Sequence, residues 1–441
     1  MRKLLGITVL GLILSGYVYA KDYSNYFFSF NVWLLENGYN QYLERDEEGV
    51  LRNNLKINKY KGRWSIPFEK NPNRDTLIYY NYKNLFSHET GDGGTLQWDK
   101  YSIPPSKNPY KFKSNLVEHK FIKKQMQKKS ILSYLYFNDD QIVIDELTPK
   151  NQFGEFVNNE TKLRSNSVGK TMISYVLGHA ICEGYIDGVN SKISDWPLVQ
   201  NTLYQDQKLI DLLNMASGDQ KYVYDSVILK NGKYKQSVVA EADTRDIYHY
   251  MKIIFDNSKK SKPKYNYNII NTNLIFNYVL FKTEEDFQKI LNKTFQEKSQ
   301  IKNSVYFFKV PGTSPEYGDA NSMFYAARYD YLRIAKAMMD DWQNDTCVGK
   351  YLKTIYKNRI KKNLPRRKKT RVEQATTSYG GQFHLDIIGM KDRKILGMGG
   401  YGGQQILIDV ENSKIIVLHS IHFNKDSHNY NWNKIVYSVI K

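Results

Sequence analysis

The stretch of residues 164–184 restricts the fold of this chain more than any other part of the sequence. After Lys170, apolar residues recur at spacings of three and four, which predicts a helix with one apolar face; they are Ile173, Val176, Leu177, Ala180 and Ile181. Gly184 stands where a glycine commonly ends a helix. Ser167 and Lys170 would share a face of its first turn, so the helix begins with a hydroxyl beside an amine.

This pair of side chains has two interpretations. A hydroxyl next to a half-buried amine is a known form of activated nucleophile, and a helix N-terminus offers backbone N–H groups to a developing oxyanion. A capping serine followed by a surface lysine has the same Ser-x-x-Lys spacing. The segments that follow Ser167 and Lys170 therefore have to decide between catalysis and capping.

The N-terminus predicts export. The basic start Met1-Arg2-Lys3 precedes an apolar run over residues 4–18, and a small-x-small site ends at Ala20. We therefore expect residues 1–20 to be a signal peptide that is cleaved after Ala20. No later segment reaches the length of an apolar membrane span, and no cysteine follows the cleavage site to carry a lipid. The mature chain is expected to be periplasmic or secreted.

Charge and cysteine content narrow the partners. The formal net charge is +19, which would attract anionic envelope polymers. The sequence has no zinc-finger spacing and no basic-aromatic RNA motif, so nucleic acid is not expected as a partner. The densest basic run, residues 357–371, is typical of a solvated loop. Cys182 and Cys347 are the only cysteines, and the sequence leaves open whether they pair.

Hydrophobic patterns divide the chain into an extension and a domain. Residues 21–125 predict an N-terminal extension in which we recognise no chemistry. Residues 126–441 begin with a hairpin, 131–137 and 141–147, and end with a second, 405–410 and 415–421. Helices are expected at residues 209–218 and 323–342 and around Ile435 and Val439. Hairpins at both ends predict an α+β fold, with an antiparallel sheet flanked by helices and a helical subdomain between.

Five segments of this domain occur in an order that belongs to a known family. They are Ser167-Val168-Gly169-Lys170, residues 211–218 (DLLNMASG), residues 265–273 (YNYNIINTN), residues 327–330 (ARYD) and residues 400–404 (GYGGQ). This order resembles the serine β-lactamase and penicillin-binding-protein superfamily, in particular its class C-like serine hydrolases, which include esterases and 6-aminohexanoate-dimer hydrolases. The resemblance leaves the N-terminal extension unexplained.

The resemblance implies roles for matching residues. Ser167 resembles the nucleophile, and Lys170 the amine that helps to deprotonate it. Tyr267 resembles the catalytic tyrosine, an acid/base that passes the proton to the leaving group, with Tyr265 as the neighbouring candidate. The backbone N–H groups of Ser167 and Gln404 would form the oxyanion hole.

Two departures from the family pattern concern substrate binding. Ile269 stands where many members have the asparagine of Tyr-x-Asn. The family's Lys-Thr-Gly is represented by Tyr401, Gly402 and Gly403, which would line the substrate site without a cation. The missing lysine binds a carboxylate of β-lactams and peptidoglycan stems, so its loss argues against those substrates. Other cations could substitute for it, such as Arg328 or Arg371.

Other motifs fail on context. Residues 397–402 fit the dinucleotide fingerprint but lead into a predicted strand instead of a helix. His419 and His422 would point to opposite faces of a strand, so with His428 they are expected to be structural or surface residues and not zinc ligands. Asp92 lies beside glycines, yet the carboxylate spacing of a calcium loop is absent.

Together these features predict an exported serine hydrolase that cleaves a small or peptide-like ester or amide through an acyl-enzyme on Ser167. The resemblance implies neither a metal nor an organic cofactor. Two alternatives stay open. One is a penicillin-interactive D-Ala-D-Ala peptidase or β-lactamase, and the other is a catalytically silent protein that binds envelope polymers through its basic surface.

Overall fold

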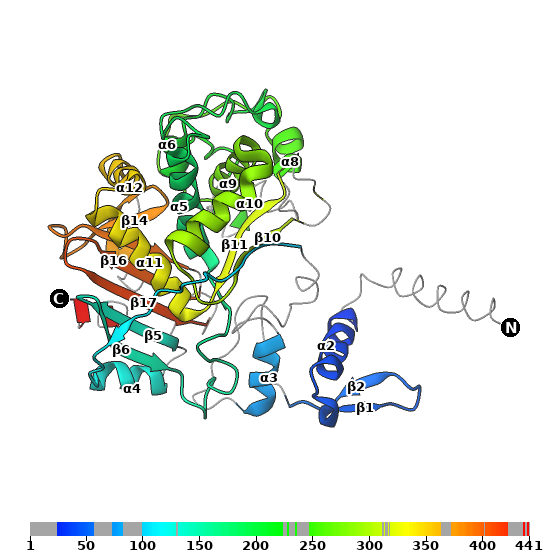
Figure 1. Ribbon diagram of the computed structural model, residues 1–441. Helices are drawn as coiled ribbons and strands as arrows, with labels where there is room; N and C mark the ends of the chain where they lie inside the picture. Colours follow the sequence, from blue (N-terminus) through cyan, green and yellow to red (C-terminus); the bar gives the residue numbers. More distant parts are fainter. Residues whose placement is uncertain are drawn as a thin grey trace. The chain divides into compact units, whose positions relative to one another are not determined.

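The structure is a computed structural model that describes residues 24–56, 73–82, 99–128, 131–223, 227–228, 234–235, 247–310, 313, 316, 318–362, 372–400, 402–421, 435–436 and 439–440 (Figure 1). The chain forms two compact units, residues 1–59 with 72–97 and residues 60–71 with 98–441. The predicted signal peptide and Asp92 lie outside the described residues.

The smaller unit is built around aromatic side chains. Its described elements are α2 (Ser24–Glu36), η1 (Asn40–Tyr42), β1 (Leu43–Arg45), β2 (Leu51–Asn53) and α3 (Arg74–Tyr82). The rings of Phe30 and Trp33 on α2 lie 4.6 and 5.5 Å from the ring of Tyr82 on α3. All three side chains are buried, so the aromatic residues near the start of the extension join its two helices.

The larger unit contains, in its described part, a sheet with the strand order β12-β13-β14-β15-β16-β17-β5-β6-β4. The strands are β4 (Lys113–Ser114), β5 (Ile131–Asn138), β6 (Gln141–Leu147), β12 (Ile360–Lys361), β13 (Thr376–Gly380), β14 (Phe383–Ile387), β15 (Ile395–Gly399), β16 (Gln405–Asp409) and β17 (Lys414–Ser420). All neighbours are antiparallel except β4 and β6. Because β5 pairs with β17, the two ends of the unit share one sheet, and the predicted α+β class is confirmed.

Helices cover both faces of this sheet. On one face, α4 (Lys120–Lys128) and α13 (Val372–Ala375) contribute to a cluster with Tyr134, Leu407 and Leu418. On the other face, α11 (Arg328–Gln343) packs against β16 and β17, and Figure 1 shows α4 and α11 on opposite sides of β5. A strand covered on both faces is apolar on both, which explains the continuous apolar runs of β16 and β17.

A second, smaller sheet supports the start of the Ser167 segment. In the described residues it has the order β3-β10-β11-β7, with β3 (Lys100–Ile103), β7 (Leu163–Arg164), β10 (Val305–Lys309) and β11 (Ala320–Ala326). β3 pairs with β10 through Ile103 and Val305. β3 lies within the predicted N-terminal extension, residues 21–125, but pairs with a strand of the larger unit.

One helix begins later than predicted. The helix expected over residues 323–342 is α11, which begins at Arg328, whereas residues 323–326 end strand β11. Phe324 and Tyr325 pack against rings of β10, with centroids 4.8 Å from Phe307 and 5.2 Å from Tyr306. This cross-strand packing holds residues 323–326 in a strand, ahead of the helical apolar stripe that begins at Tyr331.

The remaining elements form the predicted helical subdomain and its connections. They are η3 (Asn166–Val168), α5 (Gly169–Cys182), η4 (Pro197–Val199), α6 (Leu209–Leu213), β8 (Val227–Ile228), β9 (Tyr234–Lys235), α8 (Ile247–His249), the π-helical η5 (Tyr250–Ile254), α9 (Ile270–Thr283), η6 (Glu284–Asp286), α10 (Phe287–Leu291), the π-helical η7 (Asn292–Lys298) and α12 (Cys347–Lys357). None of the described helices is long and apolar enough to cross a membrane.

Helix α5 lies at the centre of the larger unit. It ends where predicted, since Gly184 has a φ of +82°. Residues 169–180 are all buried, because α9, α12 and β11 surround the helix. The prediction of a helix with one buried apolar face is thus too narrow, because the whole circumference of α5 is buried. Ser174 pairs with the hydroxyl of Tyr351 at 2.9 Å, so polar positions of α5 face partners instead of water.

A disulfide joins α5 to α12. Cys182, the last residue of α5, pairs with Cys347, the first residue of α12, across 165 residues of sequence. The sequence left open whether these two cysteines pair; in the structure they form a disulfide that closes a long loop.

Both predicted hairpins are confirmed. Asp139 and Asp140 form the turn between β5 and β6 with φ of 46° and 63°, a conformation that aspartate tolerates. At the end of the chain, Ile435, Val436 and Ile440 are helical and buried. The rest of the predicted terminal helix lies outside the described residues.

Candidate active site

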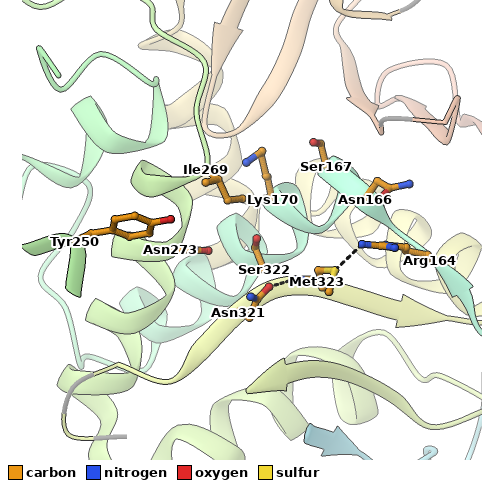
Figure 2. A pocket seen from close by; sticks show the side chains of 10 residues that line it. All are labelled: Arg164, Asn166, Ser167, Lys170, Tyr250, Ile269, Asn273, Asn321, Ser322 and Met323. Carbon is orange, nitrogen blue, oxygen red and sulfur yellow. Dashed lines mark hydrogen bonds between the residues drawn. The ribbon is translucent and has the colours of Figure 1, made fainter. Parts of the chain in front are cut away.

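The chain places Ser167 at the junction between a strand and a helix. β7 pairs with β11, and Ser165 continues the pairing because its N–H donates to the Phe324 carbonyl at 2.9 Å. Asn166 then turns the chain with a φ of +47°. Ser167 lies in the short helix η3, directly before α5. This turn directs the Ser167 hydroxyl into a pocket (Figure 2).

Two glycines allow close packing around this turn. A Cβ on Gly169 would lie 2.2 Å from the Ser322 carbonyl oxygen, so a larger residue would push α5 away from β11. A Cβ on Gly400 would lie 2.7 Å from the Ser165 carbonyl oxygen. The glycine-rich segment after β15 therefore packs directly on the segment that carries Ser167.

Lys170 is a buried amine without a carboxylate partner among the described residues. Its side chain is 3% exposed. Its Nζ donates weakly to the Asn268 carbonyl at 3.3 Å and to the Thr272 hydroxyl at 3.4 Å. Burial lowers the pKa of Lys170 from 10.5 to about 7, because a charged ammonium loses its hydration there. A large share of these amines is thus neutral near pH 7 and can accept a proton.

Tyr267 lies beside this amine. The Nζ of Lys170 is 5.2 Å from the centroid of the Tyr267 ring. Both tyrosines pack on Tyr379, with ring centroids 5.2 Å away for Tyr265 and 5.9 Å away for Tyr267. The contact with Lys170 fits Tyr267 as the proton-transfer residue, and the assignment between Tyr267 and Tyr265 stays a prediction.

A buried carboxylate fixes the segment that carries Tyr267. Asp219 accepts hydrogen bonds from Asn266 at 2.7 Å and from Asn268 at 2.9 Å, one residue on each side of the tyrosine. The N–H of Asn266 donates to the Met215 carbonyl at 2.7 Å. Burial raises the pKa of Asp219, and these hydrogen bonds oppose the rise. The segment at residues 211–218 therefore helps to position the catalytic candidate.

Lys170 is linked to the large sheet by a chain of hydrogen bonds. Thr272 donates to Gln382 Oε1 at 2.8 Å. The Nε2 of Gln382 donates to the Leu213 carbonyl at 3.1 Å. Gln382 stands between β13 and β14 with a φ of 69°, so the amine, the Tyr267 segment and the sheet are held together.

Ser167 and Lys170 line the same cavity of about 260 Å³, close to the lower limit of roughly 300 Å³ for small-molecule sites. The other lining residues are Arg164, Asn166, Tyr250, Ile269, Asn273, Asn321, Ser322 and Met323. Figure 2 shows Lys170 on the first turn of α5 and Ser167 on the turn before it, with Asn321 and Met323 on β11. Ile269, which departs from the family pattern, is 40% exposed at this pocket.

The third predicted motif is described in part. Tyr401 lies outside the described residues. Gly402 and Gly403 have φ of 114° and 93°, a conformation that glycine adopts without strain. Gln404 is buried, and its side chain donates to the Ser420 carbonyl at 2.9 Å. These three residues do not belong to the lining of the cavity, so their roles in the oxyanion hole and in substrate binding stay predictions.

Arg328 is not a substitute for the missing lysine. Its guanidinium is 1% exposed and forms an ion pair with Asp145 at 2.6 Å. It also donates to the Ser133 hydroxyl at 2.6 Å and to Asn159 at 2.9 Å. A guanidinium with this set of partners supports the sheet and cannot reach a substrate. Arg371, the other candidate, lies outside the described residues.

Part of the basic run is buried beside Tyr267. Lys362 donates to the Thr376 hydroxyl at 2.5 Å and lies 3.3 Å from Nδ1 of His384. The His384 ring stacks on Tyr267 with a centroid distance of 6.1 Å. Burial, followed by the charges of Lys362 and Lys170, holds the pKa of His384 well below 6.5. The prediction of a solvated loop is therefore wrong for Lys362.

The described residues contain no group of three or more histidine, cysteine, aspartate or glutamate side chains placed to hold a metal ion. His419 is 2% exposed, as expected for a structural histidine, while His422 and His428 lie outside this part of the chain.

Solved structures share this architecture over most of their length. A provisionally named 6-aminohexanoate-dimer hydrolase from Bacillus anthracis has a TM-score of 0.57 at 12% identity, with 85% of this chain and 97% of that chain covered. A provisionally named β-lactamase from Bacteroides dorei DSM 17855 has a TM-score of 0.51 at 13% identity, with 73% and 96% covered. The chain shares the fold of these two structures, and this is the α+β arrangement that the resemblance in sequence implied.

No protein-family profile and no curated protein sequence matches the chain. A likeness at this low identity concerns the fold, so the activity has to be inferred from the side chains at the site. In that fold Ser167 and Lys170 line one cavity, and the Lys170 amine lies beside the Tyr267 ring; the catalytic roles of these residues stay predictions.

Among the lining side chains that sequence reasoning missed are Arg164, Tyr250, Asn273 and Asn321. Arg164 precedes Ser167 by three residues, and a cation so close in sequence to the predicted nucleophile is the signal that could have identified it. The other three come from separate elements whose meeting depends on the fold.

Proposed function

We propose that the chain is an exported serine hydrolase that cleaves esters or amides through an acyl-enzyme on Ser167. The observation that carries the proposal is the buried Lys170 amine, with a pKa lowered to about 7, in the pocket that Ser167 also lines. A structural lysine on a buried helix would be expected to have a carboxylate partner, and none pairs with Lys170 among the described residues.

The chemistry follows from these groups. Neutral Lys170 accepts the Ser167 proton while Oγ attacks the substrate carbonyl carbon. The tetrahedral intermediate collapses as the bond to the leaving group breaks, and Tyr267 passes the proton to that group. Water then attacks the acyl carbon and gives a proton to Lys170, and Oγ of Ser167 takes that proton as its bond to the acyl group breaks and the acid is released. The N–H groups of Ser167 and Gln404 are proposed to stabilise the oxyanion.

Two features support the export part of the proposal. The N-terminal sequence has the pattern of a signal peptide. The Cys182–Cys347 disulfide is a bond that persists in oxidising compartments.

Hydrolysis of p-nitrophenyl acetate and butyrate tests the proposal. The wild type should turn over both esters, and Ser167→Ala should lose this activity. Ser174→Ala is the matched control, because Ser174 lies on α5, the helix that directly follows Ser167, and pairs with Tyr351 away from the pocket lining. Equal turnover by wild type and Ser167→Ala would refute the proposal.

A second measurement tests the substrate class. Since Tyr401 stands where the family's anion-binding lysine would be, the esters should be better substrates than the β-lactam nitrocefin. Comparable efficiency on both would contradict the role assigned to that position.

A further inference from the structure

Arg164 differs from every other arginine that the structure describes in the larger unit. Arg328, Arg333, Arg359 and Arg393 each form an ion pair with an aspartate. Arg164 has no carboxylate within reach among the described residues. Its recorded hydrogen bond runs from a terminal nitrogen to the Met323 sulfur at 2.9 Å, drawn in Figure 2, and a thioether is a weak acceptor.

The guanidinium also has an unused donor. Its Nε is buried and has no hydrogen-bond partner. A partly buried cation without a counter-ion loses hydration free energy, so a guanidinium at this position calls for a partner that the described residues do not supply.

The position of Arg164 shows where that partner binds. Arg164 lines the cavity that also contains Ser167 and Lys170. The ten lining residues include two basic ones, Arg164 and Lys170, and no carboxylate. Two more buried polar atoms of the lining lack partners, the donor Nδ2 of Asn321 and the acceptor Oδ1 of Asn273. A pocket with a guanidinium, no carboxylate and two unsatisfied donors, Nε of Arg164 and Nδ2 of Asn321, favours an anionic group.

We propose that Arg164 binds a carboxylate of the substrate, so that the preferred substrates are esters or amides that also carry an acidic group. The planar guanidinium can donate two parallel hydrogen bonds to a carboxylate, which fixes its orientation as well as its charge. The inference rests on the proposed hydrolase function and adds a substrate class to it. Arg164 comes from β7, a different part of the chain from the Tyr401 segment where the family's cation would stand.

Two esters of equal length test this assignment. One is the mono-4-nitrophenyl ester of adipic acid, which has a free carboxylate, and the other is 4-nitrophenyl methyl adipate, in which that carboxylate is capped. The readout is the ratio of their kcat/KM values after subtraction of spontaneous hydrolysis. In the wild type the kcat/KM of the acidic ester should exceed that of the capped ester by about tenfold to a hundredfold, which corresponds to the free energy of one charge-assisted hydrogen bond. The difference should arise mainly from a lower KM.

Three variants identify the source of the preference. Arg164→Gln removes the charge and should bring the ratio close to one. Arg164→Lys keeps the charge without the planar fork and should retain part of the preference. Arg52→Gln is the control for loss of one surface charge, since Arg52 is 59% exposed in the smaller unit, and it should keep the wild-type ratio.

The outcomes separate this inference from the proposed function. A wild-type ratio near one, or an unchanged ratio in Arg164→Gln, overturns the role of Arg164 while ester hydrolysis stands. Absence of turnover of both esters, or equal turnover by Ser167→Ala, overturns the hydrolase and this inference with it. If Arg164→Gln fails to fold, the wild-type ratio and the Arg164→Lys ratio decide.

Discussion

A carboxylate placed beside Lys170 should move the pH dependence of the enzyme. At a pKa of about 7, about half of the amines are neutral at pH 7, compared with about one in three thousand at the ordinary value. If neutral Lys170 is the base, kcat/KM rises with pH through about 7 and levels off above it. His384, the nearby histidine, does not account for this inflection, because its pKa lies well below 6.5.

Thr272→Asp supplies the carboxylate. The Thr272 hydroxyl is 3.4 Å from Nζ, and an opposite charge at this distance raises a lysine pKa by about one to three units. The neutral fraction at pH 7 would fall from about one half to between about one in ten and one in a thousand. We therefore expect about 5-fold to 500-fold lower kcat/KM at pH 7, with most of the loss recovered at pH 9 to 10.

Thr272→Asn is the matched control, since it has the shape of aspartate without the charge and can still donate to Gln382. Its inflection should stay near pH 7. The assay is kcat/KM for p-nitrophenyl acetate from pH 5 to 10, with the spontaneous rate subtracted. A common inflection in the Asp and Asn variants, or a flat profile in the wild type, would refute the assignment of Lys170 as the base.

Three other perturbations have defined outcomes. Cys182→Ser with Cys347→Ser opens a loop of 165 residues and should lower the free energy of unfolding by up to about 5 kcal/mol on a loop-entropy basis; urea unfolding that matches the wild type would contradict this. Arg328→Met leaves the carboxylate of its ion pair without a cation and should cost about 3 to 5 kcal/mol, which the same urea measurement would show. Tyr267→Phe should lower kcat by about two to four powers of ten, whereas Tyr265→Phe should change it little; the reverse pattern would mean that the catalytic tyrosine is Tyr265.

The sequence predicts local elements well where one pattern decides the outcome. The turn at Asp139 and Asp140 follows from two apolar runs separated by residues that tolerate positive φ. The end of α5 follows from Gly184. The prediction that Ser167 and Lys170 lie near Tyr267 came from the order of segments, because no periodicity links residues that are so distant in sequence.

Tertiary contacts explain what the sequence does not predict. Residues 323–326 belong to a predicted helix, yet pairing of β11 with β10 makes them a strand. Lys362 belongs to a run that is typical of a solvated loop, but the partners that bury it, Thr376 and His384, come from other strands. Arg164 differs from the other arginines because no described carboxylate pairs with it. The sequence does not show this difference, because only the fold reveals which aspartates pair with which arginines.

The most direct test of the central claim is the mapping of a covalent label. A fluorophosphonate reacts with an activated serine, and mass spectrometry of the digested protein identifies the modified residue. We expect one equivalent of label on Ser167, with none bound to Ser167→Ala, strongly slowed labelling of Lys170→Ala and normal labelling of the control Ser174→Ala. Label on another serine, or equal labelling of wild type and Ser167→Ala, would contradict the assignment of Ser167 as the nucleophile.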